Sequence, residues 1–244
     1  MNGLMQNTNL LWTGFYLAPA PSQGNRSWMT HLADLRAMAP GWGIAPIFVG
    51  QQHPSITTAG VSHVRTAEQG RRDALLAAQL ADQAGFTSGA EADLSGAPRI
   101  YLDIEIGGTL PPEDLAYVNA WCATIRSDQT SYLPGVYCSF KDTAAQLQRD
   151  NPDLVCWVFN INQFLHHHDQ ALTDPGVFRK PDIGQSGFPA ATAWQWIQGL
   201  ASISVQLPGG GTQSLPSWDL DVSVVPDPSH PDRKFDADAG TWLD

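Results

Sequence analysis

Hydrophobic and polar positions alternate between strand-like and helix-like segments over the first two thirds of the chain. Short apolar runs rich in β-branched and aromatic residues predict strands, and longer segments with Ala and Leu at helical spacing predict the helices between them. The strands are expected at residues 11–17, 43–50, 99–105, 134–139 and 154–161. The helices are expected at residues 27–38, 66–86, 113–127 and 141–150.

The pattern changes in the last third, where residues 192–200, 202–207 and 218–225 are strand-like with only turns between them. Strands that alternate with helices indicate a parallel sheet with helical crossovers. We therefore predict an α/β fold, a TIM-like barrel of about five β-α units followed by β-hairpin strands, with at least one antiparallel pairing. Residues 1–225 would form this barrel domain, and the Asp- and Pro-rich residues 226–244 an irregular C-terminal extension.

Two carboxylates interrupt the otherwise apolar strand in the stretch IYLDIEIGG, residues 100–108. Residues i and i+2 of a strand point to the same face, so Asp103 and Glu105 project together, about 7 Å apart along the backbone. Burying two unpaired carboxylates is costly, so we expect the pair at the solvent-exposed end of the strand. A functional pair is the main interpretation, and a structural pair bonded to strand-end amides or an arginine is the alternative.

The carboxyl ends of barrel strands are where active sites lie, and the other predicted strands end in further polar and aromatic residues. Carboxylates, amides and aromatic rings on one rim suit a carbohydrate, because sugar hydroxyls need polar partners and sugar C–H faces pack on rings. Core packing remains open for Trp194, Trp196 and Trp218, and is the expected role of Trp121 and Trp157. Turn formation remains open for Asp219 and Asp221. The candidate substrate contacts are Tyr16, Gln51, Tyr137, Asn160, Trp194, Trp196 and Asp221.

Charge and composition exclude several classes of partner. The net charge of -11 and the pI of 4.8 argue against nucleic acid and anionic membranes, which are themselves polyanionic. Three cysteines with no zinc-site spacing indicate reduced core thiols, although a disulfide between Cys138 and Cys156 stays open. The HHHD run at 166–169 suggests a metal site, but adjacent side chains diverge and cannot chelate easily, so a solvated loop or a helix start is the favoured interpretation. No metal and no organic cofactor is expected.

The residues as a set resemble a known family. The run YLDIE, the five β-α units and the late WQW…WDLDVS are similar to glycoside hydrolase family 25, the lysozyme-like muramidases. The segments TGFYLAPAPS, IAPIFVGQQ and PGVYCS look typical of a related group of glycoside-hydrolase-like domains. The resemblance covers roughly residues 11–225. It implies that Glu105 is the general acid, with Asp103 beside it and Asp219 as the late-strand aspartate. Tyr16 stands where the family normally has an aspartate.

These observations lead to two hypotheses from different classes. The first is a lysozyme-like glycoside hydrolase that acts on peptidoglycan. The alternative is a catalytically weak or inactive glycan-binding module, or a scaffold, on the same fold. The start of the sequence lacks a basic region followed by an apolar core, so no signal peptide is expected and the chain would be cytoplasmic as made. A wall-acting protein of this kind would leave the cell by lysis, a phage-type route or a dedicated secretion machine.

Overall fold

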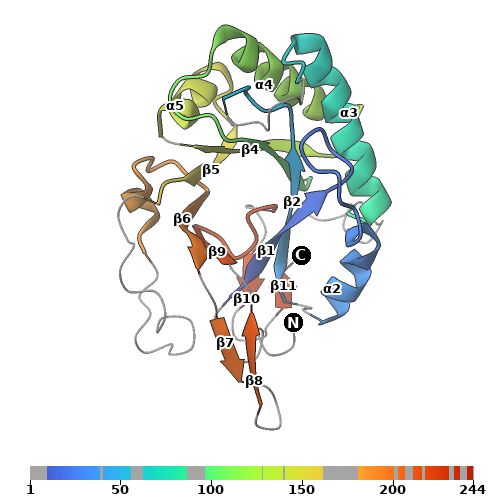
Figure 1. Cartoon of the computed structure of the whole chain (residues 1–244), viewed down its shortest axis with the longest axis vertical. Coiled ribbons are helices and arrows are strands. Elements are labelled where there is room, and N and C mark those ends of the chain that lie inside the picture. Colours follow the sequence, from blue (N-terminus) through green and yellow to red (C-terminus); the bar gives the residue numbers. More distant parts are fainter. Residues whose placement is uncertain are drawn as a thin grey trace.

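Seven strands form one curled, mostly parallel sheet (Figure 1). This computed structural model describes residues 10–38, 41–55, 63–86, 97–127, 129–139, 141–161, 181–200, 203–206, 211–215, 218–230, 234–236 and 241–243. The strands run in the order β1-β2-β3-β4-β5-β6-β9. Their bounds are β1 Trp12–Leu17, β2 Gly43–Val49, β3 Arg99–Ile104, β4 Leu133–Ser139, β5 Val155–Phe159, β6 Ala193–Leu200 and β9 Trp218–Ser223.

Helices cover the outer face of the curled sheet (Figure 1). The longest, α3, starts where the Thr66 hydroxyl accepts a hydrogen bond from the Gln69 amide at 3.2 Å, and it stops at Gly85, whose φ of 97° is left-handed. Pro112 occupies the first turn of α4, where its missing N–H costs no hydrogen bond. The α-helices are α2 Leu32–Met38, α3 Ala67–Ala84, α4 Pro112–Ile125 and α5 Lys141–Asp150, and the short 3₁₀ helices are η1 Met29–His31 and η2 Ile183–Ser186.

The α/β class and the antiparallel pairing are confirmed, but the structure shows a half-barrel. In the described residues β1 pairs only with β2, and β9 pairs only with β6. The first six strands are parallel, while β9 runs antiparallel to β6. The chain returns from β6 through an antiparallel hairpin, β7 (Ile203–Gln206) with β8 (Thr212–Leu215), and the described residues of this return contain no helix. That return reverses the direction of β9.

Part of the expected irregular extension is ordered structure. Two short strands, β10 (Lys234–Asp236) and β11 (Thr241–Leu243), pair antiparallel. Residues 227–230 are buried at the amino end of β3. There the Tyr101 hydroxyl donates to the Pro228 carbonyl at 2.6 Å, and the Arg99 amide donates to the Ser229 carbonyl at 2.9 Å. This segment therefore satisfies backbone groups where the sheet begins.

Strand parity divides the buried side chains into two sets. Ile100, Leu102 and Ile104 face the helices in the main core, whereas Tyr101 belongs to a second cluster on the inner face. The other members of that inner cluster are Ala45, Ile47, Trp157 and Ala193. The three cysteines are buried and free, so the Cys138–Cys156 disulfide that the sequence left open is not formed. Among the described helices, none is long and apolar enough to cross a membrane.

Candidate active site

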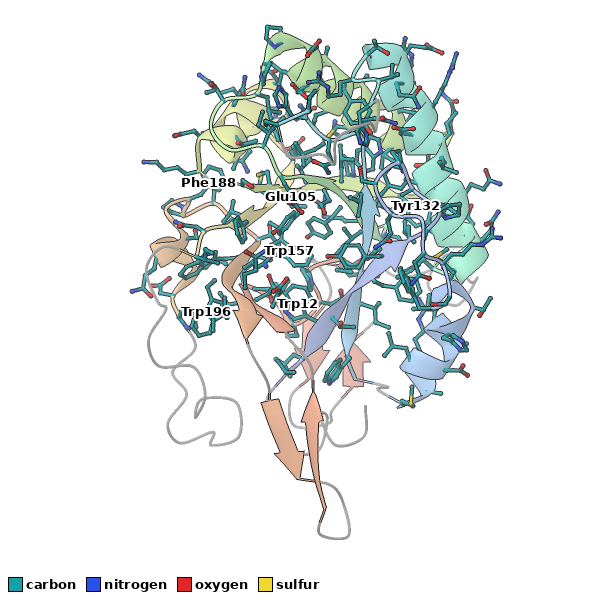
Figure 2. All side chains as sticks on the ribbon, in the orientation of Figure 1. Trp12, Glu105, Tyr132, Trp157, Phe188 and Trp196 are labelled. Carbon is teal, nitrogen blue, oxygen red and sulfur yellow. The ribbon has the colours of Figure 1, made fainter. Side chains whose placement is uncertain are left out.

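The inner face of the sheet carries a cavity of about 500 Å³. Its walls come from all seven strands of the sheet, and Figure 2 shows Glu105, Trp157 and Trp12 within the curl of the sheet. The cavity therefore gathers residues from both ends of the chain. The polar and aromatic side chains that line it are Trp12, Thr13, Tyr16, Trp42, Asp103, Glu105, Tyr137, Trp157, Gln195, Trp196, Gln198, Asp219, Asp221 and Ser223.

Asp103 and Glu105 both reach this cavity from β3, as their spacing predicts. Asp103 lies inside the strand and is 4% exposed, and burial followed by the charge of Glu105 raises its pKa well above the ordinary value. Glu105 follows the last residue of β3 and is exposed. Partial burial, and then the charge of Asp219, raises the pKa of Glu105. Both carboxyl groups are therefore biased towards the protonated state that an acid catalyst needs.

The backbone that carries these two carboxylates is held by side chains from the neighbouring strand ends. The Gln52 side-chain amide donates to the Asp103 carbonyl at 2.7 Å, and its oxygen accepts from the Glu105 amide at 3.2 Å. The Ser139 hydroxyl donates to the Glu105 carbonyl at 2.6 Å. Gln52 and Ser139 thus fix the strand end on both sides, which is how a rigid scaffold positions a reacting group.

Trp157 forms the floor of the cavity, although the sequence suggested only a core role. Its indole N–H donates to Asp221 Oδ1 at 2.8 Å, and its ring packs edge-on against Trp12, Tyr101 and Tyr137 at centroid distances of 5.0, 5.5 and 5.3 Å. Trp157 faces inward because it lies in register with Tyr137 on β4. The alternation of strand side chains was the signal that could have placed it there. Trp121, by contrast, is fully buried in the main core, as expected.

The late strand β9 supplies the remaining carboxylates. Asp219 is exposed and Asp221 is partly buried, and both line the cavity. Burial raises the pKa of Asp221 from its ordinary value near 3.8 to about 8; the hydrogen bond from Trp157 offsets part of the rise, and the charge of Asp219 adds to it. The structure thus brings both predicted aspartates of β9 to the same cavity as Asp103 and Glu105.

Two tyrosines complete the polar part of the cavity. The Tyr137 hydroxyl donates to the Gln195 side-chain oxygen at 2.6 Å. Tyr16 lies on the inner face of β1 and is 42% exposed. Partial burial, and then the charges of Asp103 and the other carboxylates, raise the pKa of Tyr16. The Tyr16 phenol is therefore neutral at pH 7 and can donate a hydrogen bond but carries no negative charge.

Three predicted substrate contacts lie outside the cavity. The Gln51 side chain is buried between β2 and α3 and donates to Asp73 at 3.0 Å. Asn160 donates to the Ser186 carbonyl at 2.9 Å and so holds the loop at η2. Trp194 is fully buried in the main core, because it has the opposite strand parity to the inward-facing Gln195. Trp196 belongs to the main core and also contributes to the cavity wall.

No group of three or more His, Cys, Asp or Glu in the described part of the chain could hold a metal ion. The HHHD run lies outside the described residues, and so does the side chain of Trp218. Chemically, the arrangement offers several carboxyl groups with raised pKa values around an aromatic floor.

A family model, the Rv2525c-like glycoside hydrolase-like domain, matches residues 6–194. The chain belongs to this family. The match includes β1 to β5 and therefore both Asp103 and Glu105, but it ends before β9. The resemblance to glycoside-hydrolase-like domains that the sequence indicated is thereby confirmed. No curated protein is significantly similar to the chain.

Several solved structures are similar to this chain at low sequence identity, and those with a TM-score above 0.5 share its fold. An uncharacterized protein of B. stearothermophilus is 14% identical with a TM-score of 0.54, and the match covers 91% of each chain. The Clostridium perfringens spore cortex lytic enzyme SleM is 12% identical with a TM-score of 0.51; the match covers 91% of this chain and 65% of SleM. The catalytic domain of endolysin ply40 from Listeria monocytogenes bacteriophage P40 is 10% identical, with a TM-score of 0.43 and coverage of 91% and 90%.

The raised pKa of Asp221 predicts a pH-dependent stability. Between about pH 4 and about pH 8 the folded protein holds a proton on Asp221 that the unfolded chain releases, so the free energy of unfolding should fall as the pH rises through this range. The Asp221→Asn side chain keeps an oxygen that accepts the hydrogen bond from Trp157, but it cannot ionise. The free energy of unfolding of this variant should therefore depend less on pH. Urea unfolding at a series of pH values measures this, with the exposed Asp153→Asn as control. Parallel profiles for wild type and Asp221→Asn would contradict it.

Proposed function

We propose that the protein is a lysozyme-like glycoside hydrolase that acts on peptidoglycan. The observation that carries the proposal is the convergence of Asp103 and Glu105 with Asp219 and Asp221 on one aromatic-floored cavity. Cleavage of a glycosidic bond needs a proton donor and a second carboxylate beside the anomeric carbon. The family assignment supports glycan chemistry, and the fold shared with SleM, a spore cortex lytic enzyme, supports the cell wall as its setting.

In this proposal Glu105 donates its proton to the glycosidic oxygen as the bond from that oxygen to the anomeric carbon breaks. Its raised pKa keeps the proton available in weakly acidic solution. Asp103 stabilises the positive charge that develops on the sugar ring, or orients the substrate's N-acetyl group. Positive charge beside Asp103 favours its ionised form, which offsets the effect of burial. Water then adds to the anomeric carbon and gives a proton to the Glu105 carboxylate, which restores the acid, and Asp219 helps to hold the geometry.

The decisive experiment is a turnover assay. Purified protein is incubated with peptidoglycan from several bacterial walls, and newly formed reducing ends and released fragments are identified by mass spectrometry. Release of disaccharide-containing fragments with new reducing ends supports the hydrolase. If no wall preparation yields new reducing ends while glycan fragments still bind, the chain acts as a glycan-binding module. If nothing binds either, the scaffold interpretation replaces both.

Tyr16 sets the expected level of that activity. A neutral phenol cannot supply the negative charge of the aspartate that the resemblance leads us to expect there. We expect slow or substrate-restricted hydrolysis by the wild type, and an increase of about tenfold for Tyr16→Asp, below the 10²–10⁴-fold typical of a fully positioned acid–base group. Initial rates of reducing-end formation compare the two, with Tyr16→Phe as the matched control. A fast wild type that Tyr16→Asp slows would instead give Tyr16 a positive catalytic role.

Delivery to the wall is a separate part of the proposal. We propose export through lysis, a phage-type route or a dedicated secretion machine. Fractionation of the producing cells, with detection of the protein in medium and wall fractions, tests it.

A further inference from the structure

The cavity is lined by acidic residues from two strands. Asp103 and Glu105 come from the end of β3, and Asp219 and Asp221 come from β9. Among the described residues that line the cavity, none is Lys, Arg or His. A ligand that enters meets four acidic groups and no described basic one, and a cation favours the ionised form of these groups, so the cavity favours a cationic ligand over an anionic one.

One of these carboxyl groups carries an oxygen without a hydrogen bond. Asp103 is 4% exposed, and its Oδ1 has no hydrogen-bond partner in the described part of the chain. A buried acceptor in this state is costly to maintain. Oδ1 itself is closed to solvent, but Asp103 lines the cavity through its other atoms, so a donor on a bound ligand reaches this oxygen once the carboxyl group turns towards the cavity. The structure therefore indicates a ligand that brings a hydrogen-bond donor to this position.

The cation that fits is larger than a metal ion. The carboxyl groups do not converge on one point, since no group of three acidic or metal-binding side chains among the described residues could hold a metal. They surround about 500 Å³ of space instead. The floor is Trp157, packed edge-on against Trp12 and Tyr137. Aromatic faces bind sugar C–H groups and organic ammonium ions.

We propose that the cavity binds an amino sugar with a free ammonium group, a de-N-acetylated hexosamine unit of a glycan. The ammonium group lies between Asp103 and Asp221 and donates to the Asp103 carboxyl group, while the sugar ring packs on the aromatic side chains that line the cavity, of which Tyr16 is the most exposed. Trp157 donates to Asp221 at 2.8 Å, which places that carboxyl group next to the aromatic floor. This inference rests on the proposed function in one respect, namely that the cavity is a glycan site.

The protonation of the carboxyl groups agrees with this assignment. Burial raises the pKa values of Asp103, Glu105 and Asp221, and neighbouring carboxylates raise them further. An ammonium group in the cavity acts in the opposite direction and lowers those pKa values. Binding of the amine form should therefore release protons from the protein, whereas binding of a neutral N-acetyl sugar should not.

Calorimetry with two oligosaccharides of equal length tests the proposal, one from chitosan with free amines and one from chitin with N-acetyl groups. In weakly acidic solution, where the amines are protonated and the carboxyl groups still hold protons, we expect the chitosan oligomer to bind at least about tenfold more tightly, with a preference that shrinks in high salt. Titrations in buffers of different ionisation enthalpy should show proton release for the chitosan oligomer alone. Equal affinities, or a preference for the N-acetyl form, would overturn the proposal.

Variants and a peptide ligand make the assignment specific. Asp221→Asn should remove most of the chitosan preference, and the exposed Asp153→Asn should keep it. Asp219→Asn, at an exposed position, provides a second test if Asp221→Asn does not fold. Lysine peptides that bind as well as the chitosan oligomer would overturn the amino-sugar assignment, because any ammonium would then suffice.

The binding experiment and the turnover assay can fail independently of each other. A chitosan preference without new reducing ends on any glycan supports the amino-sugar site and contradicts hydrolysis. New reducing ends without a chitosan preference support hydrolysis and contradict the amino-sugar site.

Discussion

Glu105→Gln is expected to lower the rate of glycan hydrolysis by about 10²–10⁴-fold, the contribution of a positioned general acid. Glutamine matches glutamate in size and leaves the backbone bonds to Gln52 and Ser139 intact, since those involve only main-chain atoms of residue 105. It has no carboxyl proton to give to the leaving oxygen. The measurement is the initial rate of reducing-end formation on the wall preparation that the wild type cleaves fastest.

The matched control for this substitution is Glu68→Gln. Glu68 is exposed on α3, where it pairs with Arg71 and Arg72 on the helix surface. The Glu68→Gln variant should hydrolyse the glycan at the wild-type rate. A Glu105→Gln variant that folds and binds glycan as the wild type does, yet hydrolyses at the same rate, would assign the acid role to another carboxyl group. Asp103 would then be the first to examine, because it has the more deeply buried side chain.

Gly70→Ala is expected to destabilise the protein by about 1–3 kcal/mol, the usual cost of overpacking. Gly70 lies in α3 where this helix meets α4, and a Cβ atom there would stand 2.3 Å from the Tyr117 carbonyl oxygen. Alanine favours a helix over glycine by about 1 kcal/mol, so propensity alone predicts the opposite sign. We expect the clash to outweigh the gain in helix propensity, because the opposing oxygen belongs to the backbone of a packed helix and cannot move aside as a side chain could.

Urea unfolding of the purified variants measures this effect. Gly24→Ala is the control, because a Cβ atom at Gly24 meets nothing within 4 Å. It should leave the midpoint nearly unchanged. A Gly70→Ala variant as stable as the wild type would mean that α3 and α4 can move apart at little cost.

The central pair of the site was predictable because strand parity is a local property. Asp103 and Glu105 lie two residues apart in one strand, so they face one way whatever the rest of the fold does. The order of strands and helices was likewise readable from short segments. The family resemblance extended this to Asp219, whose position in the late strand no local pattern could have linked to β3.

Other features depend on contacts that no local pattern contains. Gln51 and Gln52 follow β2 directly, but the chain leaves the sheet there, and Gln51 turns to Asp73 while Gln52 reaches the backbone of β3. Trp157 and Trp194 are both strand residues, and only the side on which the helices pack separates cavity from core. A barrel closes only if β1 pairs with the last strand, β9. Local sequence patterns do not show which strands at the two edges of a sheet pair with each other.

The two walls of the cavity have different origins in the chain. The wall with Asp103 and Glu105 lies within the part that matches the family model, and its strand end is anchored by Gln52 and Ser139. The wall with Asp219 and Asp221 is β9, which lies beyond that match. In the proposed hydrolase, substitutions in β9 would therefore change the wall of Asp219 and Asp221 while Gln52 and Ser139 still hold the backbone of Glu105 in place. An engineer who seeks a different glycan preference would vary β9 first and leave the anchored end of β3 unchanged.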